Sequence, residues 1–102
     1  MGRNKKRGRS FVMLERQTLK SDAWKALTSA EKLTYIGIKS NFNGGNNGEI
    51  PFKYTESYFK NATTSKALKG LLAKGWIEKT RHGGLYRYFC LYKLTGTHDF
   101  IR

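Results

Sequence analysis

The sequence predicts an α+β fold in which a three-helix core carries a small antiparallel sheet that ends in a β-hairpin. Two segments, residues 29–42 and 64–74, have apolar side chains at the spacing of an amphipathic helix. Two others, residues 76–81 and 86–94, are rich in aromatic and β-branched side chains and flank a Gly-Gly pair, which is typical of a hairpin. The length of 102 residues suits a single domain with one core.

The chain is strongly basic, with 20 Lys and Arg against 7 Asp and Glu and a formal net charge of +13. Residues 1–10 contain five of these cations, Arg7 and Arg9 among them, and no acid, so we expect a flexible basic arm there. Such an arm is either a solubilising leader or a segment that follows phosphates or enters a minor groove. Most of the positive charge lies beyond residue 10, so the folded part is expected to be basic in its own right.

Two short elements are expected before the first long helix. The apolar run Phe11–Leu14 is interpreted as an extended segment on the edge of the domain. Ser21 or Asp22 then caps a short helical turn, in which Trp24 and Leu27 point inward at i, i+3 spacing.

The first long helix is expected over about residues 29–42. Thr28 and Glu31 have the spacing of a capping box, in which each side chain accepts a hydrogen bond from the backbone N–H of the other residue. We expect Lys32 and Lys39 at the surface. The apolar face is expected to comprise Leu27, Leu33, Tyr35, Ile36, Ile38 and Phe42.

The loop Asn43–Gly48 is a strong signal for a helix stop and a turn. Its glycines invite a phosphate-binding interpretation, but no Gly-Lys-Ser/Thr follows and no strand precedes, so we expect a plain turn. A short strand is predicted at Glu49–Phe52, with Pro51 at an edge or at the strand end because it cannot donate a ladder hydrogen bond. A second, short helix is predicted at about residues 55–60, followed by a break at Asn61-Ala62.

The third helix is expected over about residues 64–74. Thr63 is its predicted N-cap and Gly75 its stop, and the short helix before it is expected to bury Tyr58 or Phe59. The apolar face is predicted to comprise Leu68, Leu71 and Leu72. The opposite side is expected to present Ser65, Lys66, Lys69 and Ala73.

The element order helix, strand, helix, helix, strand, strand resembles the winged-helix variant of the helix-turn-helix. Residues Ala62–Glu78 are similar to the recognition helix of that superfamily with its following strand, and Tyr92–Thr95 is similar to the close of the second wing strand. The resemblance implies a winged-helix DNA-binding domain at residues 11–95, followed by a short tail at residues 96–102. Within the superfamily, the turn at residues 46–48 looks like that of bacterial, phage or plasmid DNA-binding proteins, including replication-initiator domains.

Three features of the predicted fold suit contact with duplex DNA. The N-terminus of the helix at residues 64–74 offers free N–H groups and a partial positive charge, which suit a phosphate. Its lysines can contact phosphates or guanine edges in a major groove. A hairpin with glycines at its tip can approach the flanking backbone or the minor groove, where Arg is favoured. The candidate DNA-binding residues are Arg7, Arg9, Thr63, Thr64, Ser65, Lys66, Lys69, Lys79, Arg81, His82 and Arg87.

Other classes of function have little support in the sequence. No apolar window is long enough for a membrane span, and no apolar segment follows the first cations as in a secretory signal. The single cysteine, Cys90, permits no internal disulfide, so we expect a cytoplasmic, nucleoid-associated protein. Because nucleophile motifs, paired carboxylates and Cys/His clusters are missing from the sequence, we expect no enzyme activity, metal, cofactor or small-molecule ligand.

The expected partner is double-stranded DNA, and the sequence does not separate a transcription regulator from a replication-origin binder. RNA or a single strand could instead stack on exposed hairpin aromatics, namely Tyr86, Tyr88, Phe89 and Tyr92. A winged helix can also act as a protein-interaction scaffold. A homodimer would use residues 11–24 or the outer strand face. For Thr64, a position pointing into the core is the alternative to DNA contact.

Overall fold

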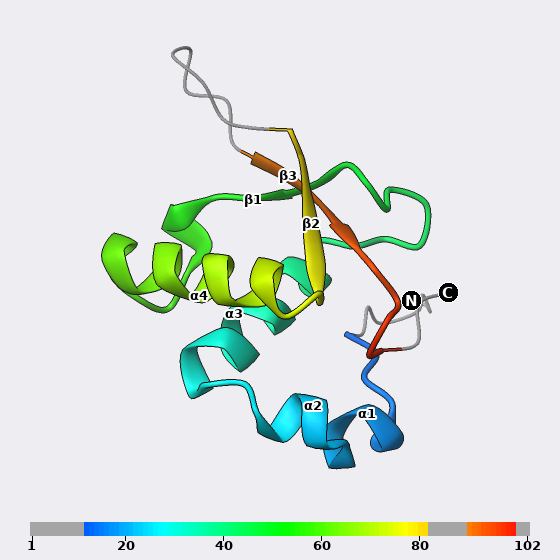
Figure 1. The fold of residues 1–102 in the computed structure, drawn as a ribbon. Coiled ribbons are helices and arrows are strands. Elements are labelled where there is room, and N and C mark those ends of the chain that lie inside the picture. Colours follow the sequence, from blue (N-terminus) through cyan, green and yellow to red (C-terminus); the bar gives the residue numbers. More distant parts are fainter. Residues whose placement is uncertain (1–11, 82–89, 100–102) are drawn as a thin grey trace, which may run out of the picture.

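The computed structural model describes residues 12–81 and 90–99. Its helices are α1 (Arg16–Lys20), α2 (Asp22–Lys25), α3 (Ser29–Ser40) and α4 (Asn61–Ala73), with a 3-10 turn η1 (Tyr54–Glu56). Its strands are β1 (Ile50–Phe52), β2 (Ile77–Arg81) and β3 (Cys90–Leu94). In Figure 1 the sheet lies at one end of the molecule, α1 and α2 lie at the other, and α3 and α4 lie between them. The described residues therefore form a small α+β domain, as the sequence predicts.

The three strands form one antiparallel sheet in the order β1-β3-β2. Ile50 lies opposite Tyr92 and Ile77 lies opposite Leu94, and all four side chains are buried. β1 is an edge strand of this sheet, where a residue without an N–H is tolerated. The edge position predicted for Pro51 is therefore confirmed.

The predicted element bounds lie close to the observed ones where local signals are strong. β1 and β2 begin at Ile50 and Ile77, next to their predicted starts, and α3 begins at Ser29 as predicted. α3 ends at Ser40 rather than at residue 42, and α1 was not predicted. The first part of the last predicted strand and the Gly-Gly turn before it lie outside the described residues.

Side-chain caps explain where α2 and α3 begin. Ser21 Oγ accepts a hydrogen bond from the Trp24 N–H at 3.2 Å, which caps α2. The Thr28 N–H donates to Glu31 Oε1 at 2.9 Å, and the Glu31 N–H donates to Thr28 Oγ1 at 3.1 Å. The capping box predicted from the sequence is therefore confirmed.

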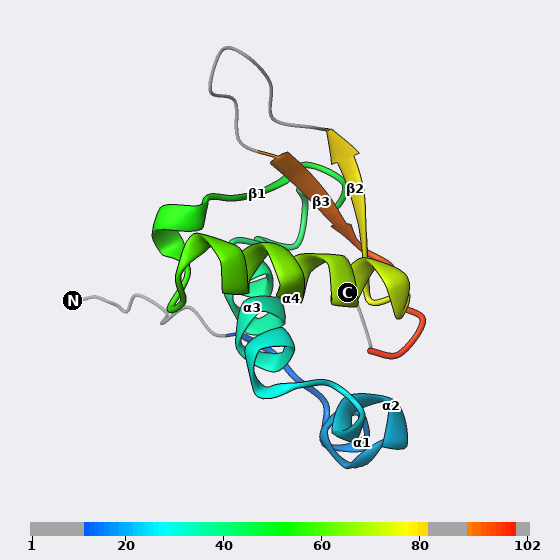
Figure 2. The same cartoon turned by 60° about the vertical axis from the view of Figure 1, so that its left-hand side comes forward.

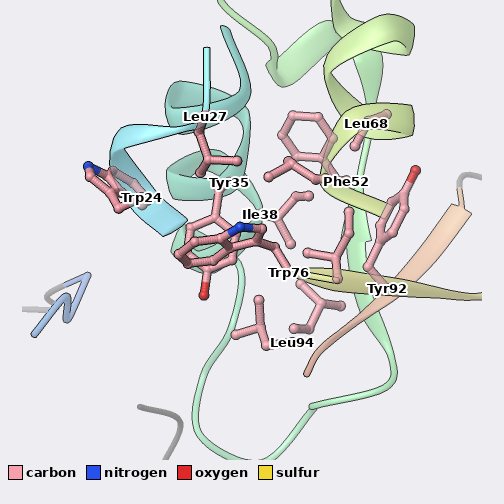
Figure 3. Packing of buried hydrophobic residues seen from close by; sticks show 12 residues of the cluster. Trp24, Leu27, Tyr35, Ile38, Phe52, Leu68, Trp76, Tyr92 and Leu94 are labelled. Carbon is pink, nitrogen blue, oxygen red and sulfur yellow. The ribbon is translucent and has the colours of Figure 1, made fainter. Parts of the chain in front are cut away.

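The core is built around three aromatic rings from different elements. Trp76 packs edge-on against Trp24 and Tyr35, with ring centroids 5.7 and 5.2 Å away (Figure 3). Side chains from the helices and from all three strands complete the cluster. Its other buried members are Leu27, Ile38, Ile50, Phe52, Leu68, Leu71, Ile77, Tyr92 and Leu94. Helices and sheet thus share a single core.

The inward face of α3 differs from the predicted one. Leu33, expected in the core, is 39% exposed, whereas Lys39, expected at the surface, is buried. The buried residues of α3 are Glu31, Thr34, Tyr35, Ile38 and Lys39. Tyr35 and Ile38 are thus buried as predicted, but because the other buried residues are polar, the spacing of apolar residues alone does not identify the whole inward face.

Lys39 is buried because it forms an ion pair with Asp99 inside the protein. The same carboxylate accepts hydrogen bonds from the Tyr35 hydroxyl at 2.6 Å and from Thr18 Oγ1 at 3.0 Å. Burial, together with the hydrogen bond to Asp99, raises the pKa of Tyr35, so its hydroxyl remains a donor. Asp99 therefore packs within the domain, although it lies in the segment expected to form a short tail.

Asparagine side chains organise the loop between α3 and β1. Asn47 Nδ2 donates to the Leu94 carbonyl at 3.1 Å, and Asn47 Oδ1 accepts from the Leu94 N–H at 2.8 Å. Its amide thus pairs with β3 much as a strand residue would. Asn46 Nδ2 donates to the Asn41 carbonyl at 3.0 Å across the loop. The predicted turn is confirmed, and these bonds attach it to the end of α3 and to the sheet.

Candidate nucleic-acid interface

α4 begins earlier than the sequence predicts, at Asn61 rather than at residue 64. Lys60 occupies the N-cap position, and Thr63 lies within the first helical turn instead of capping it. The predicted break at the start of α4 and the predicted cap are therefore wrong. The preceding turn is tied to the helix, because Ser57 Oγ and Thr64 Oγ1 lie 2.6 Å apart.

The segment before α4 is a tight turn rather than the short helix predicted at residues 55–60. Its only helical part is η1, and the Ser57 N–H donates to the Tyr54 carbonyl at 3.1 Å as η1 ends. Phe59 is half-buried, whereas Tyr58 is 77% exposed. Periodicity could not identify Tyr58 as a surface residue, because the segment lacks a regular repeat.

The end of α4 follows the predicted glycine stop. Gly75 has a φ of +80°, a left-handed conformation that glycine adopts without strain. The Gly75 N–H donates to the Leu72 carbonyl at 3.2 Å, and the Trp76 N–H donates to the Leu71 carbonyl at 3.0 Å. These two bonds make a Schellman motif, which directs the chain from α4 into β2.

α4 lies across α3 (Figure 2), and the two helices meet closely where Gly70 faces Glu31. A methyl group at Gly70 would lie 1.8 Å from Glu31 Oε2, so the glycine leaves room for this carboxylate. Glu31 Oε1 accepts a hydrogen bond from Lys74 Nζ at 2.7 Å. Burial alone would raise the pKa of Glu31, but hydrogen bonds from Lys74 and Thr28 lower it overall. These contacts fix the position of α4 on α3.

The two sides of α4 differ in chemistry. Its inner side is anchored in the protein by the buried residues Thr64, Ala67, Leu68 and Leu71. On the other side, Thr63, Lys66 and Lys69 are exposed and follow one another at i, i+3 spacing, so they share one face. We call these three residues the basic face of α4. The sequence of α4 contains no Asp or Glu, so no acid within the helix offsets this charge.

The structure separates the predicted DNA-contact residues of α4. Three of them form the basic face, whereas Ser65 is half-buried. Thr64 is fully buried, and its hydroxyl contacts Ser57 Oγ at 2.6 Å and the Phe59 carbonyl at 3.4 Å. The assignment of Thr64 to DNA contact is therefore wrong, and the alternative position in the core is confirmed.

β2 follows α4 and carries two further predicted contact residues. Lys79 is half-buried and Arg81 is exposed. Glu78 lies opposite Lys93 of β3, so opposite charges face each other across the two strands. β2 is therefore less uniformly positive than α4. The remaining predicted contact residues, Arg7, Arg9, His82 and Arg87, lie outside the described residues.

Two expectations about other partners involve side chains that the structure buries. Tyr92, predicted to stack on single strands, is 1% exposed and packs in the core, so that prediction is wrong for this residue. The other three aromatics predicted for this role lie outside the described residues. Trp24, in the segment expected to mediate a dimer, is buried within the chain's own core. Among residues 12–24, the exposed large apolar residues are Val12, Met13 and Leu19.

Within residues 12–81 and 90–99, no group of three or more His, Cys, Asp or Glu side chains is placed to hold a metal ion. None of the described helices combines the length and the hydropathy that crossing a membrane requires. No protein-family model, curated protein or solved structure matches the chain.

Proposed function

We propose that the protein binds double-stranded DNA, with α4 in the major groove and the β2–β3 hairpin on the flanking backbone or minor groove. The observation that carries this proposal is the basic face of α4. Its three residues lie along one side of a 13-residue helix without acids, while the opposite side is held in the core. An α-helix fits a major groove, and lysines there donate to phosphates or to guanine edges.

The arrangement of the other elements supports a winged helix-turn-helix interpretation. In this interpretation α3 is the supporting helix, α4 the recognition helix, and β2 with β3 the wing. The close contact of Gly70 with Glu31 would hold α4 at a constant angle to α3. The proposed role is binding without catalysis or cofactor, as a transcription regulator or at a replication origin, in association with the nucleoid.

A salt-dependent titration with matched double variants tests the proposal. The affinity for a labelled duplex should fall linearly with salt on logarithmic axes, with a slope of about −0.9 for each phosphate contacted. The variant Lys66→Gln/Lys69→Gln should bind more weakly and with a shallower slope. The control Lys20→Gln/Lys25→Gln removes the same charge from α1 and α2, at the far end of the molecule (Figure 1), and should bind like the wild type.

The outcomes separate the competing interpretations. Equal losses in the two double variants would mean that total charge, and not the basic face, governs binding. Weak binding that does not respond to salt would favour a protein-interaction scaffold. Preference for a single strand over the duplex would favour the alternative of RNA or single-strand binding.

A further inference from the structure

We propose that Tyr58, in the turn before α4, forms a stacking site for an unpaired nucleobase. This inference rests on the proposed function and names a more specific ligand for it, a duplex that is bulged or partly melted. With 77% of its surface exposed, Tyr58 is the most accessible of the large hydrophobic side chains in residues 12–81 and 90–99. Because most of its surface is open to solvent, its ring is available to stack on a base.

The turn that carries Tyr58 is held on both sides of this residue. Ser57 Oγ accepts a hydrogen bond from the Phe59 N–H at 3.1 Å and lies 2.6 Å from the buried Thr64 Oγ1. Thr64 Oγ1 also lies 3.4 Å from the Phe59 carbonyl. The backbone around Tyr58 is thus fixed to the first turn of α4.

The side chains near Tyr58 include a cation that can contact a nucleic-acid backbone. Lys60 is exposed at the N-cap of α4 and follows Tyr58 closely in the chain. The acid before the turn, Glu56, is engaged within the protein. Its Oε1 accepts from Asn41 Nδ2 at 2.8 Å, and its Oε2 accepts from the Lys53 N–H at 3.2 Å. Single-strand binding sites typically combine two features. Cations hold the nucleic-acid backbone, and an aromatic ring beside them stacks on the bases.

The position of Tyr58 in the chain indicates whether it would contact a paired or an unpaired base. Tyr58 lies three residues before the start of the helix that we place in the major groove, so its ring would reach the DNA at the edge of that contact. Bases in an intact duplex are stacked on their neighbours and offer no free face. A bulged or melted base offers one, and the proposed site therefore distinguishes distorted DNA from regular DNA.

Two duplexes and three variants test this site. One duplex is fully paired, and the other carries a single bulged 2-aminopurine in the same sequence. The wild type should bind the bulged duplex about 5- to 150-fold more tightly, the range that one base–aromatic stack gives, and should quench its fluorescence. Tyr58→Ala should abolish the preference and the quenching without changing the affinity for the paired duplex. Tyr58→Phe, which keeps the ring, and Tyr54→Ala, which removes a less exposed tyrosine of the same segment, should keep both.

Failure of this site and failure of the proposed function give different results. Equal affinity of the wild type for the two duplexes would overturn the stacking site. So would a Tyr58→Ala variant that loses the same factor on both duplexes, because that would indicate an ordinary backbone contact. Either result leaves salt-dependent duplex binding intact. Absence of salt-dependent binding to the paired duplex in the wild type would instead contradict the proposed function.

Discussion

Lys39 of α3 and Asp99, which follows β3, form an ion pair in the interior, with only 4% and 2% of their side chains exposed. Thr18 of α1 and Tyr35 of α3 donate hydrogen bonds to the same carboxylate. One acid therefore joins three parts of the chain that are far apart in sequence. Because neither charge is solvated, each depends on the other for its stability in the fold.

The variant Asp99→Asn should lower the free energy of unfolding by about 3–5 kcal/mol, because it leaves the buried ammonium of Lys39 without a counter-charge. The double variant Lys39→Met/Asp99→Asn removes both charges and should recover a large part of this loss. Urea denaturation followed by tryptophan fluorescence measures both. Equal losses in the single and double variants would contradict the view that an unpaired charge is the cause.

Gly70→Ala should destabilise the protein by about 1 kcal/mol, even though alanine favours a helix interior over glycine by about 1 kcal/mol. The new methyl group would displace the Glu31 carboxylate from its capping box and from Lys74. In a Glu31→Ala background this conflict is gone, and Gly70→Ala should be stabilising by about 1 kcal/mol. The reversal of sign, measured by a double-mutant cycle in urea, is the test.

Glu31 should make the stability of the protein depend on pH. Its pKa in the folded protein lies below its ordinary value of 4.5, so its contribution is complete above that value and is lost as the pH falls through the lowered pKa. The stability difference between the wild type and Glu31→Gln should therefore be largest near neutral pH and shrink in acid. Lys74→Gln removes a cause of the lowered pKa and should weaken this dependence. A stability difference between the wild type and Glu31→Gln that grows toward acid pH would contradict a lowered pKa of Glu31 in the folded protein.

Thr34 offers a stabilising substitution. Its Oγ1 is buried and lacks a hydrogen-bond partner within the part of the chain that the structure describes. Thr34→Val keeps the branched shape and removes this hydroxyl, so we expect an increase of about 1 kcal/mol in the free energy of unfolding. Thr64→Val is the matched control, because the hydroxyl of Thr64 contacts Ser57 and its removal should destabilise. Thermal unfolding of both variants compares them directly.

Under the proposed function, Lys69 and Arg81 should affect DNA binding differently. Lys69→Ala should lower the affinity about tenfold and also reduce the discrimination between duplex sequences, because a lysine in the major groove can read base edges. Arg81→Ala should weaken binding to all duplexes alike, because backbone contacts carry no sequence information. Titrations with a duplex selected from a random pool and with its scrambled version give the affinity of each variant relative to the wild type and its discrimination between the two sequences. If Lys69→Ala discriminates between the two sequences as well as the wild type does, Lys69 contacts phosphates and not base edges.

Features that depend on neighbouring residues were predictable from the sequence. The capping box of Thr28 and Glu31, the stop at Gly75 and the strands on both sides of α4 all follow local rules, and the structure contains each of them. The exposed positions of Lys66 and Lys69 were predictable from helical spacing, whereas Thr63 was expected at the N-cap and instead lies within the first turn of α4.

Features that depend on distant partners were not predictable in this way. Lys39 lies 60 positions from Asp99, and only the fold shows that the lysine is buried. The inward position of Thr64 likewise depends on the turn at Ser57, which has no periodic signal. The role of Gly70 becomes visible only once Glu31 packs against it.

The strand order β1-β3-β2 has a consequence for the way the protein is made. The central strand is the last of the three to be synthesised, and both outer strands pair with it alone. While the ribosome is still translating the segment up to residue 89, Ile50, Phe52 and Ile77 have no finished sheet in which to be buried. The sheet can therefore close only after Cys90–Leu94 has emerged, and until then the nascent chain exposes apolar strands that a chaperone could bind.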